Sequence, residues 1–186
     1  MEEIELYIED AKEHMEKSVK HLSHELTKIR AGRAMPNMVD GISVEYYGAQ
    51  TPLSQVASVN TPDARTLMIK PWEKTILGEI EKAIINSDLG LNPQNDGEVI
   101  RLNIPPLTEE RRVALVKQVK QEGETGKISI RNIRKEANDH VKKLLKEHVS
   151  EDEIKKAEQE IQELTDNYVK KIDSLLAKKE EEIMHV

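Results

Sequence analysis

Apolar residues recur at steps of three and four along the start of the chain, as far as Ile29. This spacing places them on one face of a helix, which is typical of a helix in a bundle or a coiled coil. The members of the stripe are Ile4, Ile8, Ala11, Met15, Val19, Leu22, Leu26 and Ile29. The pattern stops in the segment RAGRAMP, because Gly32 and Pro36 disfavour continuation of a helix. The sequence therefore predicts one long amphipathic helix that ends near Arg30.

Residues 37–104 carry short runs of β-forming residues punctuated by turn residues. The runs read GISVEYYG, QVASVN, RTLMIK and EVIRLNI, and the segments TPDA and QNDG are typical of turns. A helical pattern interrupts them between Trp72 and Asn86, and the segment SDLG that follows is typical of a helix end with Gly90 just beyond it. The apolar face of that helix consists of Ile76, Ile80, Ala83 and Ile84. The segment predicts a small β/α domain with one helix.

A second long helical pattern follows the segment IPPL, with Thr108 as the expected N-cap residue. Its stripe consists of Val116, Val119, Gly123, Gly126, Ile130, Ile133, Ala137, Val141 and Leu144. Because the two glycines fall in phase with the stripe, one continuous helix to about His148 is predicted, although an interior glycine costs about 1 kcal/mol relative to alanine. We expect Gly123 and Gly126 to let a neighbouring helix approach closely.

A third helix is predicted to begin at Ser150, because the segment SEDE fits a capping box between Ser150 and Glu153. Its apolar stripe consists of Ile154, Ala157, Ile161, Leu164, Tyr168, Ile172 and Leu175. Three amphipathic helices bury their stripes against one another. We therefore predict an α+β protein: a three-helix bundle of residues 1–30 plus 106–186, and an inserted β/α domain of residues 31–105.

Two linkers join the predicted domains, at residues 30–36 and 104–107. Each combines helix-breaking residues with few apolar anchors, and the second contains the stiff pair Pro105 and Pro106. Two covalent connections permit the domains to swing but discourage free tumbling. The linkers are therefore a predicted hinge.

Composition narrows the class of protein. With 37% hydrophobic, 34% charged and 3% aromatic residues, elongated helices with a large solvated surface fit better than a compact enzyme. The chain has no cysteine, which excludes disulfides, thiolate metal sites and cysteine nucleophiles. The N-terminal segment MEEIELYIED lacks the features of a secretory signal, and no segment has the length of a membrane span. We expect a cytoplasmic protein.

Positive charge gathers in one part of an otherwise acidic chain. The net charge is −7, yet residues 101–149 contain twelve Lys or Arg and seven Asp or Glu, a net charge of +5. On the second long helix, one stripe opposite the apolar face consists of Lys127, Arg131, Arg134, Asn138 and Lys142. Two interpretations remain open: a phosphate-binding surface, or ion pairs with acidic residues of the other two helices. With no Phe and one Trp, a platform for stacking bases is not evident, which favours a folded RNA as partner.

Two segments resemble functional motifs, a phosphate-binding loop and a histidine metal site, but lack the residues that these sites need. The segment GETGKIS lacks the first glycine, the Ser or Thr after Lys127, and the preceding strand of a phosphate-binding loop. The histidines of the first helix, His14, His21 and His24, have helical spacing but no accompanying metal-binding motif. We expect no catalytic residues, no metal and no cofactor.

Five segments of the chain form a recognisable combination. They read KIRAGRAMP at the end of the first helix, DGISVEYYGAQTPL and SDLGLNP in the insert, IPPLTEERR at the return, and RNIRKEANDHVKKLL in the second long helix. Together, in this order and over essentially the whole chain, they closely resemble the bacterial ribosome recycling factor family. One departure is Gly126, where relatives have bulkier residues, and this predicts extra flexibility near Gly123 and Gly126.

The resemblance implies an L-shaped protein that is not an enzyme, in which a three-helix bundle and a β/α/β domain meet at a hinge. Members of this family bind the ribosome after termination. With elongation factor G and its GTP hydrolysis they split it into subunits, which releases messenger RNA and tRNA for new rounds of translation. A cytoplasmic monomer that uses no membrane is expected.

The resemblance also implies roles for particular residues. In the family the bundle lies on large-subunit ribosomal RNA near the intersubunit bridges, through arginines that match Arg112, Arg131 and Arg134. The hinge pieces of the family match Arg30, Ala31, Gly32, Arg33, Ala34, Met35, Ile104, Pro105, Pro106 and Leu107.

Two other function classes remain possible on the sequence. A bundle-based adaptor or chaperone would bind protein through its helix grooves and never touch RNA. A metal-dependent enzyme would use the histidines of the first helix. Sedimentation with salt-washed ribosomes tests the first alternative, and metal analysis of the purified protein tests the second.

Overall fold

A computed structural model describes residues 2–147 and 149–185. The chain forms two compact units, one of residues 2–30 and 109–185 and the other of residues 31–108. Residues 1, 148 and 186 of the predicted bundle lie outside the described residues. The second unit includes residues 106–108, which the sequence analysis had assigned to the bundle.

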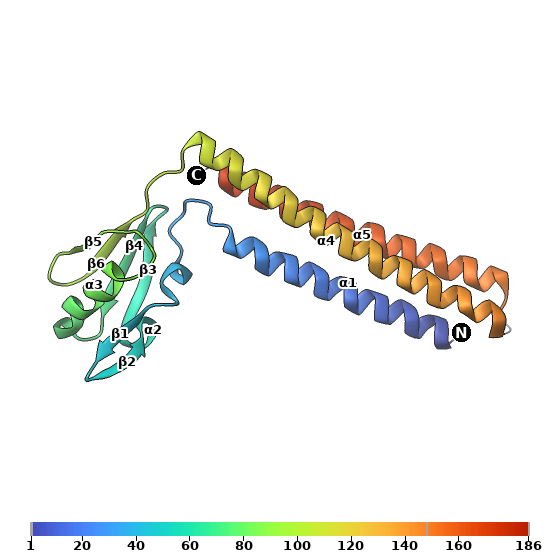
Figure 1. Ribbon diagram of the computed structural model, residues 1–186, viewed down its shortest axis with the longest axis horizontal. Helices are drawn as coiled ribbons and strands as arrows, with labels where there is room; N and C mark the ends of the chain where they lie inside the picture. The colour runs from blue at the N-terminus through green and yellow to red at the C-terminus, as the bar shows by residue number, and fades with distance from the viewer. Residues whose placement is uncertain (1, 148, 186) are drawn as a thin grey trace. The chain divides into compact units, whose positions relative to one another are not determined.

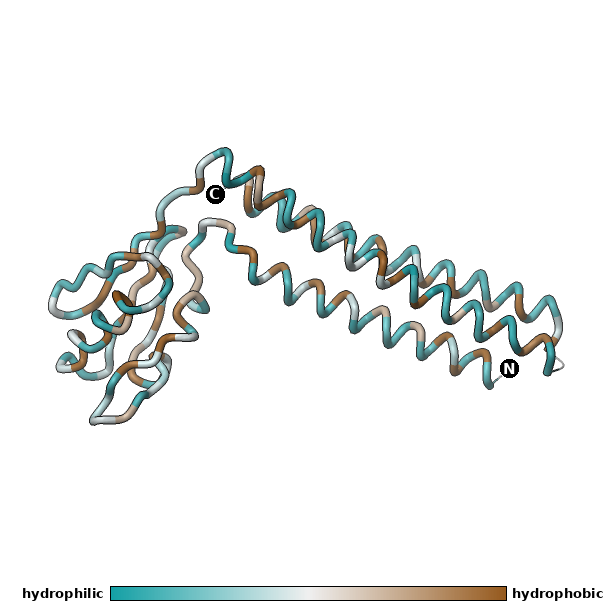
Figure 2. Tube along the Cα trace, in the orientation of Figure 1, coloured by the Kyte–Doolittle hydropathy of each residue, from teal (hydrophilic) through white to brown (hydrophobic). Residues whose placement is uncertain are grey.

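Three long helices make up the helical unit: α1 (Glu2–Lys28), α4 (Glu109–Lys143) and α5 (Glu151–Met184). They lie side by side, and hydrophobic residues recur along each of them (Figures 1 and 2). At the end where α1 begins, their apolar faces meet in a core of Ile4, Ala11, Ala137, Val141, Leu144, Ile154, Ala157 and Ile161. The amphipathic stripes therefore face one another, as the spacing of apolar residues requires.

Helix α4 runs without interruption through both of its glycines, as predicted, and ends at Lys143. A 3₁₀ turn, η3 (Leu144–Glu147), follows it, and His148 lies outside the described residues. The buried stripe contains Leu115 in place of the expected Val116, which is only half-buried. The buried stripe of α5 continues past Leu175 to Ile183. It does so because all three helices extend to the end of the bundle at which α1 ends and α4 begins.

The two glycines of α4 face side chains of the neighbouring helices at short distance. A Cβ atom at Gly123 would lie 2.7 Å from Leu176 Cδ2 of α5, and one at Gly126 would lie 3.1 Å from Leu22 Cδ2 of α1. The first separation is below any ordinary van der Waals contact and the second is tight. The predicted close approach of neighbouring helices is therefore confirmed, most strongly at Gly123.

The start of α5 carries the predicted capping box. The Glu153 backbone N–H donates to Ser150 Oγ at 3.3 Å, and the Ser150 backbone N–H donates to Glu153 Oε2 at 3.1 Å. These bonds satisfy backbone donors that a helix start leaves without partners. The Ser150 hydroxyl also donates to Glu153 Oε2 at 2.8 Å, and this bond, followed by the one from the Ser150 N–H, holds the pKa of Glu153 below its usual range. The first turn of α5 is thus fixed by local sequence alone.

The small unit contains two antiparallel sheets. One is a hairpin of β1 (Ser43–Tyr46) and β2 (Ala49–Pro52), and the other has the strand order β3-β4-β6-β5 (Figure 1). The strands of the second sheet are β3 (Ala57–Asp63), β4 (Thr66–Pro71), β5 (Pro93–Asn95) and β6 (Ile100–Asn103). Short helical elements complete the unit: η1 (Pro36–Val39), α2 (Leu53–Val56), η2 (Lys74–Ile76) and α3 (Leu77–Ile85).

One hydrophobic core joins these elements. Most of its fully buried side chains come from α3 and from the central strands β4 and β6, with Val44 of β1 and Leu53 of α2 beside them. Those of α3, β4 and β6 are Ile80, Ile84, Leu67, Ile69, Ile100 and Leu102. Burial alternates along β4 and β6, as expected for a sheet with one face on the core. The predicted β/α domain is thus a sheet with α3 packed through a shared core.

Several boundaries in the small unit differ from the sequence prediction. The helix expected from Trp72 begins as η2 and ends at Ile85, so Gly90 lies beyond it as expected but in a loop and not directly after its last turn. Strands β2 and β5 and helix α2 were not predicted. Strands β2 and β5 have few apolar or β-branched residues, and the ladders to β1 and β6 bring them into the sheets.

The β1–β2 hairpin turns through two residues with positive φ, Tyr47 at 48° and Gly48 at 81°. This is the backbone of a type I′ turn, which suits the twist of a hairpin. Gly48 adopts it freely, whereas an L-residue such as tyrosine loses about 1–2 kcal/mol there. The Tyr47 side chain is nevertheless 82% exposed, so burial of the ring does not offset that cost.

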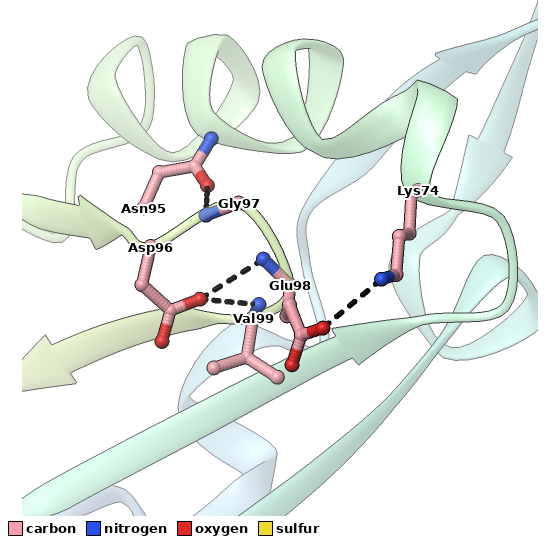
Figure 3. Close-up of polar contacts among 6 residues, drawn as sticks. All are labelled: Lys74, Asn95, Asp96, Gly97, Glu98 and Val99. Carbon is pink, nitrogen blue, oxygen red and sulfur yellow. Dashed lines mark hydrogen bonds and ion pairs between the residues drawn. The ribbon is translucent and has the colours of Figure 1, made fainter.

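The β5–β6 turn corresponds to the predicted QNDG turn and is built from side-chain to backbone bonds (Figure 3). The backbone N–H groups of Glu98 and Val99 both donate to Asp96 Oδ1 at 2.9 Å, and Gly97 N–H donates to Asn95 Oδ1 at 2.8 Å. Arg101 Nη1 pairs with Asp96 Oδ2 at 2.8 Å. The Val99 and Glu98 N–H groups, with the Arg101 charge, hold the pKa of Asp96 below its usual range.

Acid should weaken the small unit through this turn. Because the folded pKa of Asp96 lies below the unfolded one, its contribution to stability is present above the unfolded pKa, near 3.9 for a free Asp, and disappears as pH falls through the folded value. Asp96→Asn should therefore reduce the loss of stability between neutral pH and about pH 3. Urea unfolding at each pH, followed by NMR signals of residues 57–103, measures it. Asp88→Asn, an exposed loop change, is the matched control, and an Asp96→Asn variant as acid-sensitive as the parent would contradict the prediction.

Both predicted linkers are anchored to the small unit. The Ala34 N–H donates to the Ala64 carbonyl at 2.8 Å, and the Ile104 N–H donates to the Arg65 carbonyl at 2.7 Å, so both segments bond to the β3–β4 turn. Ala31, Ala34 and Ile104 are buried. The expectation of few apolar anchors is therefore wrong, because Ala34 and Ile104 belong to the hydrophobic core of the small unit.

Gly32 and Leu107 explain why residues 106–108 belong to the small unit. Gly32 has a φ of 74°, and a Cβ atom there would lie 2.7 Å from Leu107 Cγ. Only glycine combines this backbone conformation with this close approach. The two linkers therefore pack on each other on the small-unit side of Arg30 and Glu109.

Candidate RNA-binding face of the helical unit

The predicted basic stripe of α4 runs beside α5, and its two ends are tied to that helix. Lys127 Nζ pairs with Asp173 at 2.6 Å, and Lys142 Nζ pairs with Glu158 at 3.2 Å. The Lys127 side chain is only 22% exposed. At these two positions the structure agrees with the ion-pair interpretation, because the antiparallel α5 presents carboxylates along the flank of α4.

The middle of the stripe is different. Arg131 Nη1 pairs with Glu124 of its own helix at 3.0 Å, and both side chains are more than half exposed. Such a pair contributes little and exchanges readily with solvent or with another anion. Arg134 is half-buried, and no carboxylate between residues 2 and 147 or 149 and 185 forms an ion pair with it. Two guanidinium groups one turn apart are thus accessible to an external anion.

The sequence predicts Asn138 on the exposed stripe, but its side chain is half-buried. Its Oδ1 atom is buried and has no hydrogen-bond partner in the part of the chain that the structure describes. The reason is its place on the flank of α4, next to the buried Ala137 and Val141. Its side chain therefore contributes less to an exposed stripe than its spacing suggested.

Arg112 lies apart from the stripe. It is fifteen residues before Lys127 on α4, or about 22 Å along a helix axis. Its Nη1 donates at 2.8 Å to the backbone carbonyl of Met184, in the last turn of α5. A cation there satisfies a carbonyl that a helix end leaves without a partner and faces the negative end of the helix dipole. The structure does not bring Arg112 together with Arg131 and Arg134.

Lys135 was not among the predicted site residues. It is exposed and lies four residues after Arg131, so both side chains emerge on the same side of α4. The i, i+4 spacing of Arg131 and Lys135 in the sequence could have identified Lys135 as part of the positive surface. The accessible positive cluster consists of Arg131, Arg134 and Lys135, and we call it the α4 basic cluster.

The histidines of α1 are not gathered with other metal-binding side chains in the described part of the chain. His14 Nδ1 lies 3.4 Å from the Asp10 carboxylate. Within residues 2–147 and 149–185, no group of three His, Cys, Asp or Glu side chains is arranged to hold a metal ion. None of the helices in these same ranges has the length and apolar character that a membrane crossing requires.

Comparison with known proteins identifies the family. The family model of ribosome recycling factor matches residues 22–184. Ribosome-recycling factors of Cytophaga hutchinsonii and Amoebophilus asiaticus are 58% and 59% identical to this chain, each over 186 residues and 100% of both chains. The chain belongs to the ribosome recycling factor family. Membership predicted from the five sequence motifs is therefore confirmed.

Solved structures of ribosome recycling factors share the fold. A solution structure of the ribosome recycling factor is 39% identical, with a TM-score of 0.76 and 100% of both chains covered. A second is titled as models of the T. thermophilus ribosome recycling factor and E. coli elongation factor G bound to the E. coli post-termination complex. It is 52% identical, with a TM-score of 0.63, and covers 97% of this chain and 98% of that one. The α+β fold class is confirmed, and a role in ribosome recycling is supported.

Proposed function

We propose that this chain binds the post-termination ribosome and, together with elongation factor G and GTP, splits it into subunits, which releases messenger RNA and tRNA. The observation that carries the proposal is identity above 50% over the full chain to ribosome-recycling factors. A 52% identical neighbour is titled as a ribosome recycling factor bound with elongation factor G to a post-termination complex. In this proposal the chain is a cytoplasmic monomer without a cofactor, and GTP hydrolysis belongs to the elongation factor.

The α4 basic cluster is the proposed contact to large-subunit ribosomal RNA near the intersubunit bridges. Two observations support it: Arg131 has only an exposed, exchangeable ion pair, and no carboxylate in the described ranges pairs with Arg134. A guanidinium group donates two parallel hydrogen bonds to phosphate, which suits a site that reads the backbone and not the bases. Lys127 and Lys142 flank the cluster and position it through α5. Arg112 is assigned a structural contact, to the Met184 carbonyl, and Asn138 is left out of the cluster because its Oδ1 atom is buried.

We also propose that motion between the two units takes place where the chain leaves the anchored part of the linkers. Ala34 and Ile104 are hydrogen-bonded into the small unit, so they move with it. The remaining flexible points of the predicted hinge are Arg30 on one side and the residues around Thr108 on the other. This proposal is narrower than the hinge of residues 30–36 and 104–107 expected from sequence.

A subunit-splitting assay tests the function. Purified post-termination ribosomes are mixed with the chain, elongation factor G and GTP, and dissociation is followed by light scattering. We expect splitting only when all three are present, because the chain supplies binding and the elongation factor supplies the energy of hydrolysis. Splitting that is equally fast without the chain would contradict the proposal.

Sedimentation with salt-washed ribosomes distinguishes an adaptor from an RNA-binding factor. Association with the large subunit should weaken as salt rises, because phosphate contacts release counterions. No association at any salt concentration would favour the adaptor or chaperone alternative.

A further inference from the structure

Two neighbouring tyrosines at the β1–β2 hairpin form a fixed cluster with a residue from after β4. Tyr46 and Tyr47 lie edge to face with ring centroids 4.5 Å apart. Their hydroxyl groups both donate at 3.0 Å to one carboxylate, Tyr46 to Glu73 Oε1 and Tyr47 to Glu73 Oε2. We call these three residues the tyrosine clamp. The clamp holds both rings in one geometry on the surface of the small unit.

The conformation of Tyr47 is not explained by the fold of the small unit. Its left-handed backbone suits Asn, Asp or Gly, the usual residues of this turn. Its ring is 82% exposed, so the unit gains little by burying it. A tyrosine held in a strained conformation with an open ring face is typical of a binding surface.

The hydroxyl groups keep the clamp rigid at physiological pH. A tyrosine hydroxyl group, with an ordinary pKa of about 10, is protonated at physiological pH and can donate. The hydrogen bonds to Glu73 raise the pKa of Tyr46 and of Tyr47 further. A pre-organised aromatic contact loses less conformational entropy on binding than a mobile one. The clamp therefore presents a ready-made surface.

The carboxylates around the tyrosine clamp favour a positively charged ligand. A cleft of about 250 Å³ beside the rings is lined by Glu45, Tyr46, Tyr47, Gly48, Thr75, Ile76 and Glu79. Glu79 pairs with Lys82 at 3.5 Å, but no Lys or Arg lines the cleft, and in the described ranges none forms an ion pair with Glu45 or Glu73. A carboxylate offers about four lone-pair sites, and the two hydroxyl groups occupy only two of them.

We propose that the tyrosine clamp is a docking site for an arginine side chain of a protein partner. A planar guanidinium group can lie on the exposed Tyr47 ring and donate to the free sites of Glu73, with Glu45 beside it. A nucleic acid fits less well, because the carboxylates repel phosphates. The site lies in the small unit and does not depend on the proposed RNA contact of α4.

NMR titration with N-acetyl-arginine amide at low salt tests the proposal, with neutral N-acetyl-citrulline amide as its isostere. Arginine amide should cause saturable shifts at the backbone amides of residues 46–48 and 73, and citrulline amide should not. Tyr47→Gly removes the ring, suits the positive φ and leaves the net charge unchanged. It should reduce affinity about twofold to fivefold, the range for an exposed cation–π contact.

Glu73→Gln keeps an acceptor oxygen for one hydroxyl group, turns an N–H donor toward the other, and removes the charge. It should weaken binding by more than Asp88→Asn, the matched loss of one exposed charge elsewhere in the small unit. Well-dispersed amide signals of residues 57–103 confirm that each variant is folded. Equal affinity of the parent and Tyr47→Gly would overturn the proposal, because arginine would then sense only the overall acidity. Shifts of the same amides by oligouridylate and not by arginine amide would also overturn it.

Discussion

Replacing both Arg131 and Arg134 by alanine is expected to weaken binding to the large ribosomal subunit by at least about tenfold. A charge-assisted hydrogen bond contributes about 1.5–3 kcal/mol where it is well formed, and about 1.4 kcal/mol corresponds to a factor of ten. The helical unit should stay folded, because alanine is a better helix former and the lost Arg131–Glu124 pair is exposed. Binding is measured by sedimentation at several salt concentrations, and stability by urea unfolding.

The controls separate a specific contact from a change in net charge. Lys170→Ala with Lys178→Ala removes two exposed charges from α5 and should change affinity far less. Lysine at positions 131 and 134 should restore part of the salt dependence but not the full affinity, because an ammonium group lacks the planar fork of arginine. If the double alanine variant binds ribosomes normally but unfolds more easily, the α4 basic cluster is an internal ion-pair network and the proposed RNA contact is wrong.

Replacing Gly123 by valine is expected to destabilise the helical unit by about 2 kcal/mol. A side chain at this position would overlap Leu176, whose Cδ2 atom lies 2.7 Å from the site of a Cβ. Overpacking of this kind costs about 1–3 kcal/mol, and the helix propensity gained over glycine offsets only part of it. Urea unfolding followed by helical circular dichroism measures the loss.

Two further variants show whether packing is the cause. Ala114→Val places the same β-branched side chain on an exposed part of α4 and should cost only the difference in helix propensity. Gly126→Ala meets only one tight contact, at 3.1 Å from Leu22 Cδ2, so the gain in propensity should roughly cancel it. A Gly123→Val variant as stable as the parent would mean that α5 moves away from α4 without loss.

Local and periodic features were determined by the sequence alone. The stripes of α1, α4 and α5 follow from the spacing of apolar residues, which decides the buried face of a helix before any partner is known. The Ser150–Glu153 capping box and the β5–β6 turn form between residues at most a few positions apart. Membership of the ribosome recycling factor family was also predictable, because five motifs occur in the family's order between residues 28 and 145.

Contacts between distant segments were decided only by the tertiary structure. Strands β2 and β5 have weak intrinsic preference and exist because β1 and β6 pair with them. The basic stripe of α4 looked uniform in sequence, yet Asp173 and Glu158 of α5 neutralise its two ends and leave Arg131 and Arg134 between them. The tyrosine clamp joins residues 26 and 27 positions apart. Such pairings depend on how the folded elements pack. The sequence around a charged or hydroxyl group does not indicate which distant residue will become its partner.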